Sequence, residues 1–257
     1  AETSLTVPGI KYVIDSGLAR LKRYSYRTKI QRLPIEAIAQ ANAAQRAGRC
    51  GRTSPGICIR LYSAEDFALR PLYTEPEILR SNLAAVILQM TDSGLGAMEQ
   101  FPFLDPPDAR FIRDGEKCLL ELGAITEAKQ LTRTGQQLLA FPLDPRLSRI
   151  LVAAETRQVL AQAVVIVAAL SVQDVRDRPF DKAQAADQAH QPFADERSDF
   201  VTVLKIWYHL HTQQQHLSNK QFRDYCRSHY FAYVRFKDWQ DLVSQLTALC
   251  HEQWPST

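Results

Sequence analysis

The sequence has no long apolar run, and this excludes the proteins that need one. Its longest apolar block, residues 163–170, is well short of the roughly 18 residues that a membrane-spanning helix requires. No charged segment followed by an apolar one opens the printed chain, so no secretory leader is indicated there. We therefore expect a cytoplasmic protein with no membrane partner.

Cysteine is scarce and is not spaced for chemistry. The five cysteines are scattered and form no C-x-x-C pair, which is typical of reduced thiols in a cytoplasm. The histidines have no helical i, i+4 spacing, and none lies beside the paired cysteines of a zinc site. We therefore predict no metal site from these residue types.

An initiating methionine is also lacking, because the chain starts at Ala1 in sequence that already has the character of ordered structure. What is present is 257 residues with 46% apolar content, enough for one to three domains with buried cores. We expect the chain to be a piece of a longer polypeptide.

Positive charge is concentrated in one fifth of the chain. Residues 10–60 hold eleven Lys or Arg against two acidic residues, a local balance of +9 in a chain whose net charge is only +3. Such a cluster favours contact with a polyanion. A solvated basic face would have the same composition, and charge alone leaves both readings open.

The first 62 residues have a mixed strand and helix pattern. Residues 10–14 are typical of a short buried strand, and 57–62 of another. Between them, residues 21–38 alternate basic, aromatic and β-branched side chains, which predicts a projecting β-ribbon, and the alanine-rich segment 37–45 predicts a helix. Two strands and one helix are too few for an α/β domain, so the rest of that sheet is expected upstream.

The pattern then becomes helical. Thr74-x-x-Glu77 resembles a capping box ahead of an apolar stripe that ends at Gly94. Asp105-Pro106 is a second start signal, for a helix that ends at Gly123. A short hairpin over residues 124–134 and a brief helix over 136–141 follow. Two helices, a hairpin and a helix predict a winged-helix module.

The last part should be a helical bundle. Asp144-Pro145 has the form of another helix start, and residues 159–172 are apolar enough for a buried helix. Residues 173–198 are polar and predict a loop, after which at least two amphipathic helices follow. The expected fold class is mostly α with a small α/β part.

One segment carries a pattern suited to chemistry, residues 45–52 with the sequence Q-R-A-G-R-C-G-R. On a helix, Gln45, Arg49 and Arg52 would project from one face, where two forked guanidiniums match the oxygens of a triphosphate. Gly48 and Gly51 each cost roughly 1 kcal/mol relative to alanine in a helix. Glycines at these positions favour close approach to a ligand or to a neighbouring backbone.

This segment resembles motif VI, Q-R-x-G-R-x-G-R, of superfamily 2 helicases of the DEAH-box type. The resemblance implies that Gln45 orients the attacking water and that Arg49 and Arg52 reach the β- and γ-phosphates, as catalytic residues. An arginine placed where charge develops in phosphoryl transfer contributes about 10³ to 10⁵ in rate.

Residues 1–10 resemble motif V of the same family. By that resemblance Ser4 senses the nucleotide state and Thr6 lies near the nucleotide. Pro8 stands where many eukaryotic relatives have an aspartate that touches the ribose. Together with residues 24–29, the Pro8-Gly9 pair resembles the bacterial HrpA-like branch.

The basic ribbon coincides with the family's β-hairpin between motifs V and VI, which the resemblance assigns to RNA. Six basic residues and two tyrosines within residues 20–32 suit phosphate contact and base stacking, although an exposed ribbon with solubilising charge is the simpler reading. The expected RNA-binding residues are Arg20, Lys22, Arg23, Tyr24, Arg27 and Lys29.

The resemblance implies three parts. Residues 1–68 correspond to the C-terminal part of the second RecA-like lobe, 69–141 to a winged-helix domain and 142–257 to a ratchet-like helical bundle. The parent would be an ATP-dependent RNA helicase that translocates on single-stranded RNA and unwinds duplexes. It would use ATP and Mg, whose ligands lie in a first RecA-like lobe that is absent here.

No G-x-x-x-x-G-K-[ST] phosphate loop occurs in the chain, so the isolated chain is expected to be inactive as an NTP hydrolase. The competing interpretation is a non-enzymatic winged-helix and helical module that binds RNA or a protein. The sequence identifies neither the RNA substrate nor the oligomeric state, and it leaves DNA open as a substrate because backbone contacts discriminate poorly.

Overall fold

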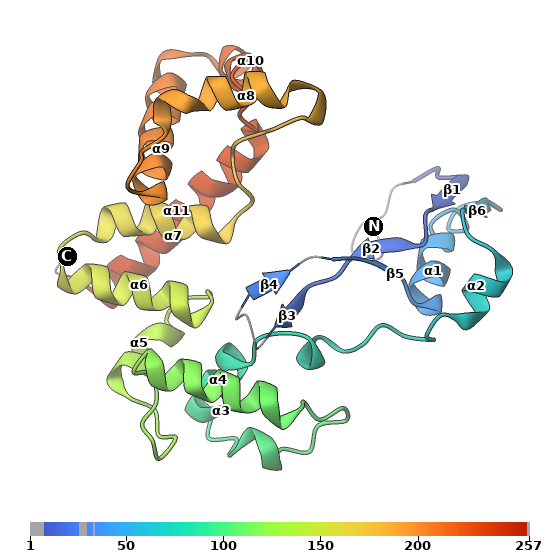
Figure 1. Cartoon of the computed structure of the whole chain (residues 1–257), viewed down its shortest axis with the longest axis horizontal. Helices are drawn as coiled ribbons and strands as arrows, with labels where there is room; N and C mark the ends of the chain where they lie inside the picture. Colours follow the sequence, from blue (N-terminus) through green and yellow to red (C-terminus); the bar gives the residue numbers. More distant parts are fainter. Residues whose placement is uncertain (1–7, 26–29, 33, 256–257) are drawn as a thin grey trace. The chain divides into compact units, whose positions relative to one another are not determined.

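The computed structural model describes residues 8–25, 30–32 and 34–255. The protein is mostly helical with a few short strands (Figure 1), which confirms the predicted fold class. It divides into two compact units, Ala1–Cys118 and Leu119–Thr257. Among the described residues, no helix has the length and apolar character needed to cross a membrane.

In the first unit, β1 (Tyr12–Asp15) and β6 (Ile57–Arg60) form a parallel pair. The helix α1 (Gln40–Ala47) contacts β1, and α2 (Ala64–Leu69) follows β6. Both predicted strands are confirmed, but the predicted burial of the first is wrong for the described residues, because Tyr12 and Ile14 are exposed. The predicted helix starts three residues later than expected, because residues 35–37 belong to a strand.

The predicted β-ribbon is confirmed and is a single hairpin. Its base pairs β2 (Leu18–Arg20) with β5 (Ile35–Ala37), and its outer part pairs β3 (Arg23–Ser25) with β4 (Ile30–Arg32). The two pairings share one continuous register, from Leu18 opposite Ala37 to Ser25 opposite Ile30, and the Leu21 amide donates to the Pro34 carbonyl in between at 3.2 Å. In Figure 1 the two strand pairs follow one another along the same ribbon.

After the sheet, a 3₁₀ turn (Glu77–Leu79) precedes α3 (Ala84–Asp92), and a second one (Met98–Gln100) precedes α4 (Ala109–Glu121). The predicted capping box at Thr74 is wrong, because the Thr74 hydroxyl bonds to Asn42 instead. The Asn82 side chain accepts from the Ala84 amide at 2.8 Å, where α3 begins.

The start of α4 also differs from the expectation. Asp108, not Asp105, accepts from an early amide of α4, that of Arg110, at 2.8 Å. The helix packs closely on α3 at Gly115, where a Cβ would lie 2.8 Å from Ile87 Cδ1 and 3.1 Å from the Ala84 nitrogen. The predicted end of the helix is confirmed, with Gly123 at a positive φ of 68°.

The second unit begins at Leu119, so the division between the units falls within α4. The hairpin predicted over residues 124–134 is reduced to one antiparallel bridge between Ile125 and Leu131. Thr132 caps the next helix, α5 (Arg133–Leu139), by accepting from the Gly135 amide at 3.0 Å. The winged-helix boundaries remain a prediction.

Asp144-Pro145 starts a helix as predicted. The Asp144 side chain accepts from the Arg146 amide at 2.9 Å, and α6 (Pro145–Thr156) follows. The apolar α7 (Leu160–Ser171) is largely buried. The loop predicted over residues 173–198 is wrong in part, because it contains α8 (Ala183–His190) between two 3₁₀ turns, Phe180–Lys182 and Gln191–Phe193.

Three further helices complete the bundle: α9 (Asp199–His216), α10 (Asn219–Ser228) and α11 (Tyr233–Gln253). The apolar α7 contacts α6, α9 and α11, so the core forms around it. The buried indole of Trp239 on α11 donates to the Val165 carbonyl of α7 at 2.9 Å, which ties the two helices together inside that core.

Candidate functional site

The start of α1 is held by the backbone that follows α2. The Gln40 and Ala41 amides donate to the carbonyls of Pro71 and Leu72 at 2.9 and 3.0 Å. The Gln40 side chain adds a bond to the Arg70 carbonyl at 2.8 Å. Because the first amides of a helix lack partners within the helix, these bonds fix the position of α1 in its unit.

The end of α1 corrects one expectation. Gln45 lies on the last turn, but the helix ends at Ala47 and Gly48 is its C-cap. The amides of Arg49 and Cys50 then bond to carbonyls three residues earlier, at 3.1 and 3.2 Å. Gln45, Arg49 and Arg52 therefore do not share one helical face; Arg49 lies in the following turn and Arg52 in the bend beyond it.

Glycine explains why the helix stops there. Gly48 and Gly51 both have low helix propensity. The returning chain also comes very close, because a Cβ on Gly56 would lie 2.1 Å from the Cys50 carbonyl oxygen. A Cβ on Gly51 would meet no described atom within 4 Å, so packing against this unit does not account for that glycine. Gln45 and Arg52 are exposed and Arg49 is half-buried.

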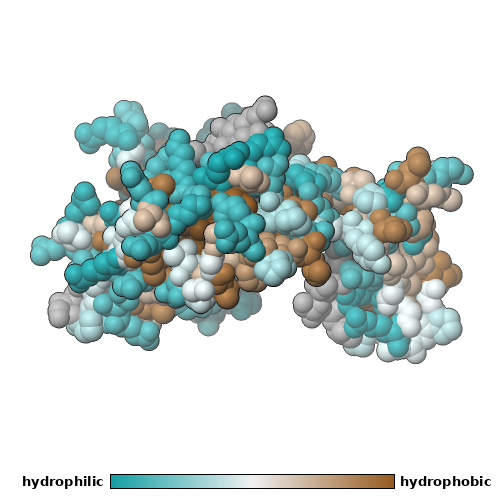
Figure 2. Space-filling model, turned by 90° about the horizontal axis from the view of Figure 1, so that it is seen from below, coloured by the Kyte–Doolittle hydropathy of each residue, from teal (hydrophilic) through white to brown (hydrophobic). Residues whose placement is uncertain are grey.

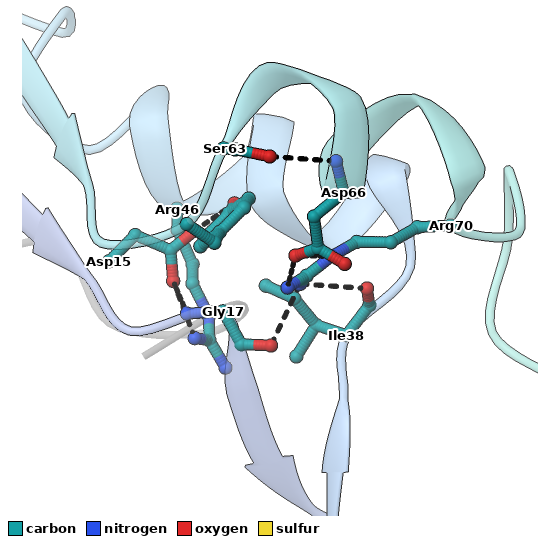
Figure 3. Close-up of polar contacts among 8 residues, drawn as sticks. Asp15, Gly17, Ile38, Arg46, Ser63, Asp66 and Arg70 are labelled. Atoms are coloured by element: carbon teal, nitrogen blue, oxygen red, sulfur yellow. Dashed lines mark hydrogen bonds and ion pairs between the residues drawn. The ribbon is translucent and has the colours of Figure 1, made fainter.

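A buried carboxylate holds the last turn of α1. Asp15 ends β1 with 1% of its surface exposed, and its side chain accepts from the Gly17 amide at 2.9 Å, from Arg46 Nη1 at 2.8 Å and from the Tyr62 hydroxyl at 2.8 Å. Figure 3 shows the bonds of the carboxylate to Gly17 and Arg46, which share its Oδ1. No pattern in the sequence assigns a role to Asp15, Arg46 or Tyr62. The signal available was a lone aspartate ending an apolar strand, which is rarely buried without a partner.

The ionisation of these groups follows from their contacts. Burial acts to raise the pKa of the Asp15 carboxyl, but the bonds from Gly17, Arg46 and Tyr62 outweigh it and hold that pKa below its ordinary value. Burial and the bond to Asp15 raise the pKa of the Tyr62 hydroxyl. At neutral pH an ionised Asp15 therefore faces the positively charged Arg46.

The predicted RNA-binding residues of the ribbon fall into two groups. Arg20 and Lys22 are exposed. Arg23 makes two bonds to Glu36, at 2.6 and 2.8 Å, and one to Glu75 at 2.8 Å. The Glu36 carboxylate is the largest cause of a raised pKa for the Arg23 guanidinium, so Arg23 serves internal ion pairs in this structure.

Tyr24 differs most from the expectation that it stacks on a base. Only 8% of its surface is exposed, its hydroxyl donates to Asp114 of α4 at 2.6 Å and its amide donates to the Arg80 carbonyl at 2.8 Å. Because the ring is buried, the prediction that Tyr24 stacks on a base is wrong for this structure. Tyr24 instead fastens the ribbon to α4. Four other predicted site residues lie outside the described residues: Ser4, Thr6, Arg27 and Lys29.

The chain is similar to known proteins over nearly its whole length. Residues 144–203 match the family model of the helicase associated domain (HA2), ratchet-like. The chain is 55% identical to the ATP-dependent RNA helicase HrpA of Escherichia coli K12 and 54% identical to the ATP-dependent RNA helicase HrpA homolog of Haemophilus influenzae Rd, each over 98% of this chain. It spans 20% of the length of each of these relatives. Over nearly its whole length the chain is therefore similar to one segment of the ATP-dependent RNA helicases named HrpA, and it contains a stretch that matches a helicase associated domain.

Proposed function

We propose that the chain supplies the arginine side of a nucleotide site in an ATP-dependent RNA helicase. The observation that carries the proposal is the segment 45–52. Its glycine-rich turn follows α1, which is held at both of its ends, and the side chains predicted to act on the nucleotide are exposed or half-buried. In this proposal the parent protein couples NTP hydrolysis to movement along single-stranded RNA, and so unwinds or remodels it.

The chemistry assigned to these residues is electrostatic. Mg²⁺ bound with ATP supplies neutralisation of the phosphate charge, and we place its ligands outside this chain. Arg49 and Arg52 donate to the β- and γ-phosphate oxygens, where forked guanidiniums suit bidentate bonds. The Gln45 amide orients the attacking water, and Ser4 and Thr6 add nucleotide contacts. Because the turn is already in place, little reorganisation is needed when charge develops.

The small parallel sheet supports the proposal that a larger lobe surrounds it. Tyr12 pairs with Ile57 and Ile14 with Ile59, so all four side chains lie on one face of the sheet. Each has at least half of its surface exposed, and Figure 2 shows hydrophobic residues over the part that holds β1, β6 and α2. Parallel sheets are normally covered on both faces. We propose that the remaining strands and helices of the second RecA-like lobe cover this one.

For RNA we propose a division of labour along the ribbon. The exposed Arg20 and Lys22, with Arg27 and Lys29 further along, contact phosphates. Arg23 and Tyr24 hold the ribbon against the segment that begins at Glu75 and against α4. Downstream, residues 69–141 act as a winged-helix domain and 142–257 as a ratchet-like bundle beside the RNA path.

The test is RNA-stimulated ATP hydrolysis by the complete polypeptide carrying Arg49→Ala. Hydrolysis should fall by about 10³-fold or more, the loss expected for an arginine that stabilises phosphoryl transfer, while affinity for single-stranded RNA is retained. Arg60→Ala is the matched control, because Arg60 is an exposed arginine at the end of β6 whose guanidinium lies over Phe67. Normal hydrolysis by Arg49→Ala, with RNA binding intact, would mean that this chain serves the complete polypeptide as an RNA-binding module and does not supply the arginines of its nucleotide site.

A further inference from the structure

The last turn of α1 is fixed by Arg46, a residue of that turn whose side chain reaches two other elements. Arg46 is the residue after Gln45, and its Nη1 bonds to Asp15 at the end of β1 while its Nη2 donates to the Leu18 carbonyl at 3.1 Å. It therefore links the end of α1 to the end of β1 and to the base of the ribbon. The three residues after Arg46 lead directly to Arg49.

Asp15 is where these links converge. Its carboxylate also accepts from Tyr62, which follows β6, and from the Gly17 amide. Gly17 has a positive φ of 70°, and a Cβ there would lie 2.6 Å from the Tyr62 ring, so the turn after β1 has no room for a side chain. The carboxylate thus fixes α1, β1 and the segment after β6 relative to one another.

A second layer holds the same turn from behind. Arg70 is buried and donates to the carbonyls of Gly17 and Ile38 at 2.8 and 3.3 Å, while its guanidinium lies over the Tyr62 ring at 3.9 Å and pairs with Asp66 at 2.6 Å. Figure 3 shows these bonds beside those of Asp15. Asp15 is therefore enclosed by groups that are themselves bonded, and such a support keeps a side chain in one rotamer.

We propose that Asp15 is a positioning residue for the phosphate-contacting arginines, acting through Arg46. The inference rests on the proposed function and deepens it, because it names what sets the geometry of that site. Asp15 itself touches neither nucleotide nor water in the reaction. Its charge keeps Arg46, and hence the turn that holds Arg49, in one place. A displacement of about 1 Å in a reacting group can lower a rate by about 10²-fold.

The experiment uses the complete polypeptide with Asp15→Asn, which keeps the shape and a carbonyl acceptor but removes the charge. The kcat of RNA-stimulated ATP hydrolysis should fall by about tenfold or more, with KM for ATP, affinity for single-stranded RNA and the melting temperature within about twofold or a few degrees of the parent. A merely structural residue would lower stability and RNA affinity together with kcat. An unchanged kcat would overturn the proposal.

The matched control is Asp187→Asn, which removes a carboxylate from an arginine pair, that of Arg178, in the second unit and not from the end of α1. It should leave kcat unchanged, and an equal loss in both variants would overturn the proposal. If Asp15→Asn does not fold, Arg46→Lys takes its place, because it retains a positive charge opposite Asp15 but lacks the second arm that reaches Leu18. It should also lower kcat by about tenfold, and an unchanged kcat would overturn the proposal.

A double-mutant cycle tests whether the two residues act as one unit. Asp15→Asn combined with Arg46→Gln should lower kcat no further than the worse single variant, because both remove the same contact. Losses that multiply would overturn the proposal. Arg49→Ala measured in parallel separates a failure of the proposed function from a failure of this inference. If Arg49→Ala hydrolyses ATP normally, both the proposed function and the inference are wrong. If Arg49→Ala is inactive while Asp15→Asn is active, only the inference is wrong.

Discussion

Gly56 comes so close to Cys50 that position 56 has no room for a side chain. The clash would be with a backbone carbonyl, which cannot rotate away as a flexible side chain does. Gly51, two residues beyond Arg49, has the opposite surroundings, with open space where a Cβ would point. The two glycines of one turn are therefore required for different reasons, Gly56 by the fold and Gly51, in our proposal, by the nucleotide.

These surroundings predict opposite effects for two similar substitutions. Gly56→Ala should destabilise the turn by about 1–3 kcal/mol, the usual cost of overpacking, and so speed hydrogen exchange at the amides of residues 48–50. Gly51→Ala should change exchange there by less than about 0.5 kcal/mol while lowering ATP hydrolysis by the complete polypeptide. Equal exchange in both variants would contradict this description of the turn.

Single residues of the candidate site could be predicted only in part from the sequence. The motif that holds Gln45, Arg49 and Arg52 is dense and specific enough to predict where the chemistry lies, and that assignment stays a prediction. It did not show the shape, because helix spacing assumes that the helix continues, and Gly48 ends it. Nor did it show Asp15, because a buried ion pair joins residues 31 positions apart and leaves no local pattern.

At the scale of elements, local start signals were reliable only when no tertiary bond competed for the same side chain. Asp144-Pro145 starts α6 as predicted, since Asp144 bonds to an amide of its own helix. Thr74 does not cap a helix, because its hydroxyl is used by Asn42 of α1. The helix α8 was missed because it is short and its only apolar residues are alanines, which give little apolar periodicity.

The ribbon is the element whose role depends most on which side chains are already occupied. Arg23 and Tyr24 are used in fastening it to its own unit, so the RNA binding that we propose depends on the exposed cations. Arg20→Ala with Lys22→Ala should weaken single-stranded RNA binding and reduce the slope of log affinity against log salt by about 1.4, or roughly 0.7 for each phosphate that is no longer neutralised. Affinity measured at several salt concentrations gives the slope.

The control for the ribbon is a second pair of exposed cations in the same unit. Lys11→Ala with Arg60→Ala removes equal charge near the small parallel sheet instead of the ribbon, and should leave the slope within error of the parent. If both pairs reduce the slope equally, the ribbon acts only through net charge and its proposed phosphate contacts are wrong.

At the scale of the whole molecule, the two units differ in how they respond to acid. Burial lowers the pKa of His190 and of His209, both in the second unit, so folding favours their neutral forms. As pH falls below the ordinary histidine value of about 6.5, the unfolded chain binds protons that the folded chain does not. The free energy of unfolding of this unit should therefore decrease through that window.

All three tryptophans, Trp207, Trp239 and Trp254, lie in the second unit, so their fluorescence reports its unfolding alone. Urea unfolding followed in this way should show a lower midpoint at about pH 5.5 than at about pH 7.5. The variant His190→Gln with His209→Gln should lose most of that difference. A midpoint that stays constant or rises in acid would contradict the loss of stability that we expect from the burial of His190 and His209.

In our proposal the forked guanidinium of Arg49 acts on the phosphates. The variant Arg49→Lys isolates the contribution of the fork, because lysine retains the charge and loses the fork. The measurement is the single-turnover rate of ATP hydrolysis by the complete polypeptide at saturating RNA and ATP. We predict a fall of about 10²-fold or more with RNA affinity unchanged, in keeping with the size of arginine effects in phosphoryl transfer. A rate within about twofold of the parent would mean that Arg49 does not perform this role, and the account would be contradicted.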